Sequence, residues 1–161
     1  MERYSAKEIL EIAINVERNG VLFYTKAAEL LEDSELKELL LRLAEWEKSH
    51  IIIFEQIQQS IKPYLSKLGM FDPAEQMAIN PKAMSTLSVF AMKPYLGRIL
   101  HGVKSRNEIL QQALKFERDS IVFFQGLKNF CKNAAGIDKL DDIICEEQKH
   151  CKIIEQSLKE L

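Results

Sequence analysis

Two short stretches of the chain place a glutamate three residues before a histidine. They are EKSH at residues 47–50 and EQKH at residues 147–150, one hundred positions apart. Residues three apart lie on one face of an α-helix, so the carboxylate and the imidazole of each pair can bind one metal ion. Because Glu is common, a single ExxH pair often occurs by chance and would not indicate a metal site. Two pairs in matched register favour one.

Two further glutamates stand in a fixed relation to these pairs. Glu17 and Glu117 each precede the ExxH glutamate by thirty residues. Apolar residues flank both at helical spacing, such as Ala13 and Val21 around Glu17, which predicts that both glutamates point inward. We therefore expect four carboxylates and two imidazoles at one level of a helical core, from Glu17, Glu47, His50, Glu117, Glu147 and His150.

The charge of this set predicts how many metal ions it binds. Four buried carboxylates without partners would be costly in free energy or would take up protons. Two divalent cations would cancel their four charges, so we expect two ions. Mixed carboxylate and imidazole ligands suit iron or manganese, whereas structural zinc sites are usually rich in thiolates and hold one ion. We expect two Fe ions, with Mn as the alternative.

The elements that must position these residues are long helices. Apolar periodicity and capping signals predict helices over residues 5–31, 34–61, 105–131 and 138–161. Residues 5–60 match residues 105–160 without a gap, and many positions are identical. This indicates one helical hairpin used twice.

The predicted fold is all-α, with one domain over residues 1–161. A chain of 161 residues of which 47% are apolar can bury one core. The hairpins cover residues 5–61 and 105–161, and residues 62–104 form a long crossover in which only the stretch after Asp72 favours a short helix. The expected architecture is a four-helix bundle with one long crossover.

Composition excludes several classes of partner. The formal net charge is −2, from 22 basic and 24 acidic residues, and no basic run would bind nucleic acid or a membrane surface. The chain has no 18-residue apolar run, and its first residues, MERYSAKEIL, are too charged for a signal peptide, so we expect a cytoplasmic protein. Three cysteines without a CxxC pair argue against a disulfide framework, a zinc ribbon and a rubredoxin-type iron site.

The order of the six candidate ligands on two hairpins resembles the ferritin-like di-iron carboxylate proteins, and within them the rubrerythrin branch. The resemblance covers nearly the whole chain outside residues 62–104. It implies that Glu47 and Glu147 bridge or chelate the metals, that Glu17 and Glu117 each cap one ion, and that each histidine binds one. It also implies reaction with dioxygen or hydrogen peroxide.

The chain departs from the rubrerythrin pattern at two points. Rubrerythrins carry an additional glutamate one turn after the third-helix ligand, which exchanges with a histidine during the redox cycle, and the matching residue here is Ser120. They also append a rubredoxin domain with paired CxxC motifs, which this sequence lacks. We therefore expect a separate electron donor, such as a rubredoxin-like protein. We expect the small residues Gly20 and Ser120 to leave room for a small oxidant.

Several residues near the site admit two interpretations. Tyr24 lies two turns beyond Glu17 and is the candidate catalytic residue, as a hydrogen-bond partner of a ligand or an electron donor, although its counterpart Phe124 favours plain packing. We interpret Trp46 as packing or a subunit contact, and His101 as a surface or loop residue. The cysteines are interpreted as small hydrophobic residues, at positions Cys131, Cys145 and Cys151.

These observations favour a di-iron oxidoreductase that reduces hydrogen peroxide with electrons from an external carrier. The alternatives are a ferroxidase or iron-handling protein that uses dioxygen, a manganese site that disproportionates peroxide, and a non-catalytic bundle that binds metal, senses oxidants or binds a partner. We expect a homodimer. The apolar stretch at residues 89–92 covers the bundle or forms a dimer contact.

Overall fold

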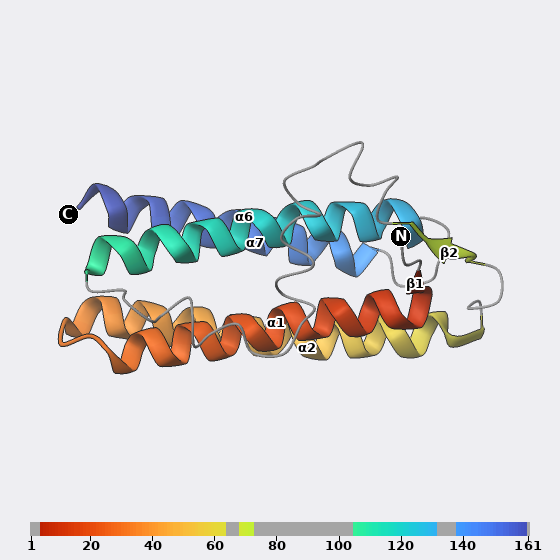
Figure 1. Cartoon of the computed structure of the whole chain (residues 1–161), viewed down its shortest axis with the longest axis horizontal. Coiled ribbons are helices and arrows are strands. Elements are labelled where there is room, and N and C mark those ends of the chain that lie inside the picture. The colour runs from red at the N-terminus through yellow and green to blue at the C-terminus, as the bar shows by residue number, and fades with distance from the viewer. Residues whose placement is uncertain (1–3, 64–67, 73–104, 132–137, 161) are drawn as a thin grey trace.

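The computed structural model describes residues 4–63, 68–72, 105–131 and 138–160, and within them the chain forms four long helices (Figure 1). Their bounds are Ala6–Glu29 (α1), Ser34–Ile61 (α2), Arg106–Cys131 (α6) and Asp138–Lys159 (α7). The predicted all-α four-helix bundle is confirmed, and the helices end within about two residues of the limits that periodicity predicts.

Side chains cap the helices at the positions that the sequence indicates. The hydroxyl of Ser5 accepts from the backbone N–H of Glu8 at 3.3 Å, and the Glu8 carboxylate accepts from the N–H of Ser5 at 2.8 Å. Ser105 and Glu108 repeat this capping box at 3.2 and 3.1 Å. Asp33 caps α2 by accepting two backbone N–H groups at 3.0 Å. These bonds satisfy donors that have no partner inside the helix.

The helices form two hairpins that pack face to face. Within the hairpins, α1 packs on α2 and α6 on α7; between them, α1 contacts α6 and α2 contacts α7. In Figure 1, the two helices of each hairpin run antiparallel. The end of α2 and the start of α6 lie at opposite ends of the bundle, so the connection between the hairpins must span its length. Most of the predicted crossover, including the possible short helix after Asp72, lies outside the described residues.

A short strand pair, which the sequence did not predict, lies beside the start of α1. Tyr4–Ser5 (β1) pairs antiparallel with Met70–Phe71 (β2), with Tyr4 opposite Phe71. The Phe71 side chain is buried and its ring meets that of Phe130 edge to face, with centroids 5.4 Å apart. Two-residue strands are too short to show alternation, so periodicity gives no signal for them.

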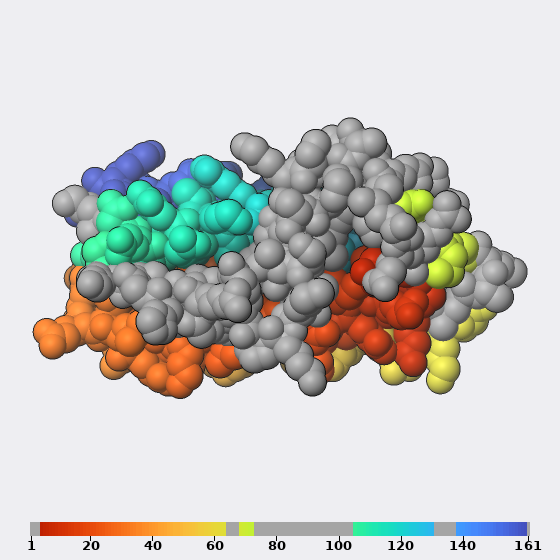
Figure 2. All heavy atoms as spheres, in the orientation of Figure 1, coloured from red at the N-terminus to blue at the C-terminus, as the bar shows by residue number. Residues whose placement is uncertain are grey.

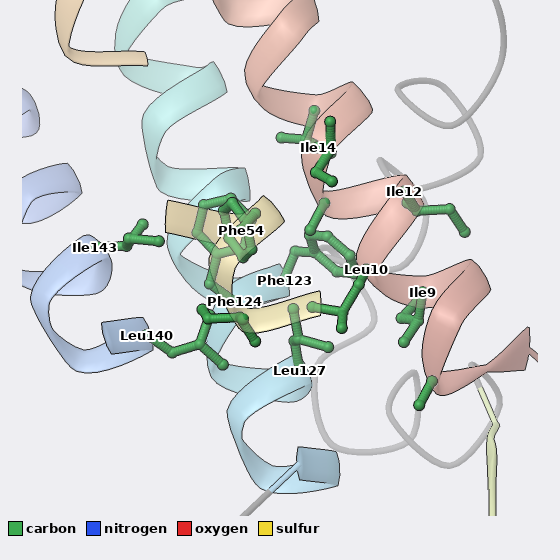
Figure 3. Packing of buried hydrophobic residues seen from close by; sticks show 14 of the residues in the cluster. Ile9, Leu10, Ile12, Ile14, Phe54, Phe123, Phe124, Leu127, Leu140 and Ile143 are labelled. Atoms are coloured by element: carbon green, nitrogen blue, oxygen red, sulfur yellow. The ribbon is translucent and has the colours of Figure 1, made fainter. Parts of the chain in front are cut away.

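Two apolar clusters fill the bundle, one toward each end. Figure 3 shows the cluster near the start of α1, where Phe54, Phe124 and Leu140 from three different helices point toward one another. The second cluster contains Tyr24, Leu40 and other residues from the opposite end. Along every helix, the candidate ligands fall between residues of the first cluster and residues of the second. The six candidate ligands therefore form a polar layer, which packed apolar side chains close off on both sides.

The outer faces of the helices carry mostly charged and polar side chains. Figure 2 shows the side of the bundle on which α1 (red to orange) and α6 (green to cyan) lie. Few large apolar side chains among the described residues are exposed, for instance Leu30 and Ile52. No helix in the described ranges is both long enough and apolar enough to cross a membrane.

Candidate metal centre

The structure brings all six candidate ligands together in the middle of the bundle. Each is buried, with at most 3% of its surface exposed. Their ligand atoms form two overlapping groups, each within 4.8 Å. We call the first the His50 position, which consists of Glu17, Glu47, His50 and Glu147. We call the second the His150 position, which consists of Glu47, Glu117, Glu147 and His150.

Glu47 and Glu147 belong to both positions, and each directs a different oxygen to each. The Nδ1 atom of His50 lies 3.0 Å from Glu147 Oε1 and 3.5 Å from Glu47 Oε2. The Nδ1 atom of His150 lies 3.2 Å from Glu147 Oε2 and 3.6 Å from Glu47 Oε1. Two carboxylates that each offer one oxygen to either side are arranged to bridge a pair of ions.

The remaining two glutamates lie at the outer ends of the pair. Glu17 Oε2 is 3.7 Å from Nδ1 of His50, and Glu117 Oε2 is 3.6 Å from Nδ1 of His150. Each position thus combines one unshared carboxylate, one imidazole nitrogen and one oxygen from each shared carboxylate.

The hydrogen bonding of these residues fits metal binding. In the described part of the chain, eight buried side-chain nitrogen and oxygen atoms lack a hydrogen-bond partner, and all except Arg106 Nε belong to the six candidate ligands. Buried polar atoms are normally paired, because leaving them unpaired costs free energy. Oxygen and imidazole nitrogen atoms that converge without partners are the donor set that iron and manganese prefer.

Without metal, burial and mutual repulsion divide the four carboxylates into two kinds. Burial, and next the charge of Glu47, raises the pKa of Glu17 well above its usual value. Burial and the charge of Glu147 do the same to the pKa of Glu117. Burial also opposes ionisation of Glu47 and Glu147, but the close approach of the neighbouring glutamates and histidines outweighs it, and the pKa of both carboxyls is lowered. Protons therefore sit on the unshared carboxylates.

The two histidines carry positive charge when no metal is bound. Burial alone would lower the pKa of each imidazole, but the carboxylates close to the ring outweigh burial. They raise the pKa of His150 to about 12 and shift that of His50 in the same direction. Two imidazolium groups and two ionised carboxylates leave the metal-free layer neutral. The four protons, two on the unshared glutamates and two on the histidines, carry the same total charge as two divalent ions.

We predict that metal binding releases protons and strengthens as pH rises. The ligand atoms must be deprotonated, so two ions should displace about four protons from the metal-free site. Acid favours the protonated, metal-free form, and affinity should fall steadily from roughly pH 8 to pH 6. Proton release on anaerobic addition of ferrous iron can be followed with a dye in weak buffer. Glu17→Gln should release fewer protons, and an affinity independent of pH would contradict the prediction.

Two residues that sequence analysis did not assign to the site contact the histidines. The Nε2 atom of His50 lies 2.9 Å from Glu146 Oε2, and the indole of Trp46 stacks on the ring of His150 with centroids 4.9 Å apart and planes 12° from parallel. Trp46 was interpreted as packing or a subunit contact, and the structure shows it packed against the ring of a candidate ligand. Sequence spacing gave no signal, because both contacts join helices of different hairpins.

Tyr24 contributes more than packing to this layer. Its side chain is fully buried, and its hydroxyl donates a hydrogen bond to Glu117 Oε1. Burial and the charge of Glu117 raise the pKa of the phenol well above its usual value, so it stays protonated. Of the two interpretations of Tyr24, the geometry shows the hydrogen bond to a candidate ligand. Phe124 has no hydroxyl and packs against Phe54.

The expected room beside Gly20 is filled. A Cβ atom at this position would lie 3.0 Å from the ring of Phe116 and 3.2 Å from Cγ of Glu47. The absence of a side chain therefore lets the Phe116 ring and a shared carboxylate approach α1 closely, and does not leave space for an oxidant. Ser120, at the equivalent place on α6, is buried.

The other predicted residues take no part in the layer as the structure describes it. Cys151 is buried next to His150, and burial raises the pKa of its thiol to about 12, which keeps it protonated. Cys145 is exposed. His101, residues 89–92 and the side chain of Cys131 lie outside the described residues.

A buried layer of four carboxylates and two histidines at the centre of two helical hairpins defines a carboxylate-rich four-helix bundle with two candidate metal positions. The comparisons with known proteins agree. The family model described as Rubrerythrin matches residues 8–158, and the chain belongs to the rubrerythrin family.

One solved structure shows the same fold along its whole length. It is that of a protein from Thermotoga maritima, described as a ferritin-like diiron-carboxylate protein, and it superposes with a TM-score of 0.71. The match covers 99% of this chain and 98% of that one at 21% sequence identity, so it carries the fold alone. The comparison with curated proteins gives no match.

Proposed function

We propose that this protein is a di-iron oxidoreductase that reduces hydrogen peroxide to water with electrons from a separate carrier. The observation that carries the proposal is the pair of shared carboxylates, Glu47 and Glu147, each with one oxygen directed to either histidine. Membership of the rubrerythrin family supports iron as the metal and peroxide as the oxidant. Manganese would fit the same donor atoms.

The reaction H₂O₂ + 2 e⁻ + 2 H⁺ → 2 H₂O needs two electrons, which two ferrous ions held by the six candidate ligands would supply. The carboxylates of the layer balance the charge of the ions in the core. Four carboxylates neutralise two divalent ions, so the layer carries no net charge when it is loaded and reduced. The apolar clusters on either side exclude water from the layer, which strengthens the electrostatic interactions inside it.

Tyr24 is proposed as the residue that supplies a proton or an electron beside the His150 position. Its hydroxyl already donates to Glu117, and the buried ring holds it in one place. The carboxylate of Glu117 in turn lies next to His150. A proton passed along this bond would reach the layer without opening the bundle to water.

The proposal extends to the electron supply, the assembly and the location of the protein. The chain has no CxxC pair that could hold a rubredoxin-type iron, so a separate donor such as a rubredoxin-like protein would restore the reduced state. A homodimer in the cytoplasm remains the prediction from sequence.

The choice of oxidant is testable with the loaded, reduced protein. We expect hydrogen peroxide to oxidise the iron at least about tenfold faster than dioxygen at equal concentration, a barrier difference of roughly 1.4 kcal/mol. Stopped-flow absorbance of the anaerobically reduced protein, mixed separately with each oxidant, measures both rates. Faster oxidation by dioxygen would favour a ferroxidase. Bound iron that reacts with neither would favour a non-catalytic role.

Tyr24→Phe should slow peroxide reduction while leaving the metal in place. The ring keeps its packing, as Phe124 does in the other hairpin, but the hydroxyl proton that Tyr24 donates to Glu117 is lost as a source. If the hydroxyl takes part in proton transfer, the rate should fall on the order of 10²-fold. Tyr4→Phe, on β1 at the end of the bundle where α1 begins, is the matched control. An unchanged rate with full iron content would assign Tyr24 to packing and ligand orientation only.

A further inference from the structure

Trp46 and Glu146 occupy equivalent positions in the two hairpins and meet equivalent partners. They are one hundred residues apart and each directly precedes a shared glutamate, Glu47 or Glu147. Each reaches across to the histidine of the other hairpin. At this one register position, however, one hairpin carries a carboxylate and the other an indole.

The carboxylate gives His50 a hydrogen-bond acceptor behind the ring. Glu146 Oε2 lies 2.9 Å from Nε2, while Nδ1 faces the shared carboxylates. This contact keeps the hydrogen on Nε2 and the lone pair of Nδ1 directed at the metal position. A carboxylate acceptor on the remote nitrogen orients a ligating histidine and makes it a stronger electron donor.

His150 has no such acceptor in the described part of the chain. All of its ion pairs with carboxylates run through Nδ1. Trp46 stacks on the imidazole at 12°, which fixes the plane of the ring, but an indole has an N–H donor and no acceptor. The stack can orient His150 without strengthening its donor nitrogen.

The two unshared carboxylates also differ in how many oxygens they can offer to an ion, and the difference again favours the His50 position. Neither oxygen of Glu17 has a hydrogen-bond partner, so both are free to bind an ion. Glu117 has one oxygen engaged by the Tyr24 hydroxyl. Phe124 stands where Tyr24 would have its counterpart, and it leaves Glu17 without a competing donor.

We propose that Glu146 and Trp46 make the two metal positions unequal, so that the His50 position binds its divalent ion first and more tightly. The inference rests on the proposed two-metal centre, but not on which oxidant that centre uses. Glu146 acts as a positioning residue, through His50. The near-symmetric ligand set would then contain one firmly held ion and one that is exchanged more readily.

The test uses metal-free, full-length protein titrated anaerobically with ⁵⁷Fe(II), followed by calorimetry and Mössbauer spectroscopy. In the wild type we expect two binding steps, and one equivalent of iron should give a single quadrupole doublet. Glu146→Ala should weaken the first step by about 10–100-fold and leave the second nearly unchanged, because only His50 loses its acceptor. One equivalent should then spread over both positions.

Three variants separate this role from a general effect on folding. Glu146→Gln retains an acceptor oxygen without the charge and should lose less affinity than Glu146→Ala. Trp46→Phe retains an aromatic ring against His150 and should change neither step by more than about threefold. Trp46→Glu supplies the missing acceptor and should bring the second step closer to the first. Circular dichroism confirms that each variant remains helical.

Two results would overturn the inference while leaving the two-metal centre intact. One is equal, simultaneous filling of both positions in the wild type. The other is a Glu146→Ala substitution that lowers the affinity of both binding steps equally, or of neither. A wild-type protein that binds no iron would overturn the metal centre itself, and with it the proposed function.

Discussion

Glu47→Ala should empty the metal centre, lowering bound iron or manganese from about two ions per chain to nearly none, because each position loses a shared oxygen. Both carboxylate oxygens of Glu47 take part, one beside each histidine. Elemental analysis of protein purified without added metal measures the change. Glu147→Ala should behave in the same way, since Glu147 holds the equivalent place.

The pattern across variants tests the shared role more sharply than any single one. Glu17→Ala removes a residue that belongs to the His50 position alone, so it should leave about one ion per chain, consistent with a two-ion site. Glu45→Ala is the matched control on α2, because Glu45 is exposed and, among the described residues, forms its ion pair with Lys48. Retention of both ions by Glu47→Ala would show that Glu47 does not bridge the positions.

Removing the metal should lower the thermal stability of the bundle by a wide margin. At a free metal concentration a thousand times the dissociation constant, one bound ion stabilises the folded state by about 4 kcal/mol. For a chain of this size each kcal/mol shifts Tm by roughly 2–4 °C, so each ion should contribute roughly 8–16 °C. Calorimetric scans of loaded and chelator-treated protein measure the difference.

Glu17→Gln provides the control for this effect. Burial and the charge of Glu47 raise the pKa of Glu17, so the carboxyl is protonated in the metal-free protein and an amide resembles it closely. The variant should therefore match the wild type when metal is absent and gain less when metal is added. A wild-type Tm that does not respond to metal would contradict the prediction, because it would mean that metal does not bind preferentially to the folded protein.

The sequence determined the helices and the identity of the six converging residues. Apolar spacing and the Ser5 and Ser105 capping boxes place α1 and α6, and the one-hundred-residue repeat aligns the two ExxH pairs. These signals are local or periodic. A helix fixes which residues share a face whatever it packs against, so inward-facing Glu17 and Glu117 could be recognised before any tertiary contact was known.

Only the tertiary structure decided which side chains meet across the hairpins. The contact of Glu146 with His50, the stack of Trp46 on His150 and the bond from Tyr24 to Glu117 depend on how far each helix slides and turns against its neighbour. The same holds for the Phe116 ring that fills the space at Gly20. Sequence spacing within a helix carries no information on that translation and rotation. The repeat therefore predicted two similar metal positions, and packing between the hairpins made their surroundings different.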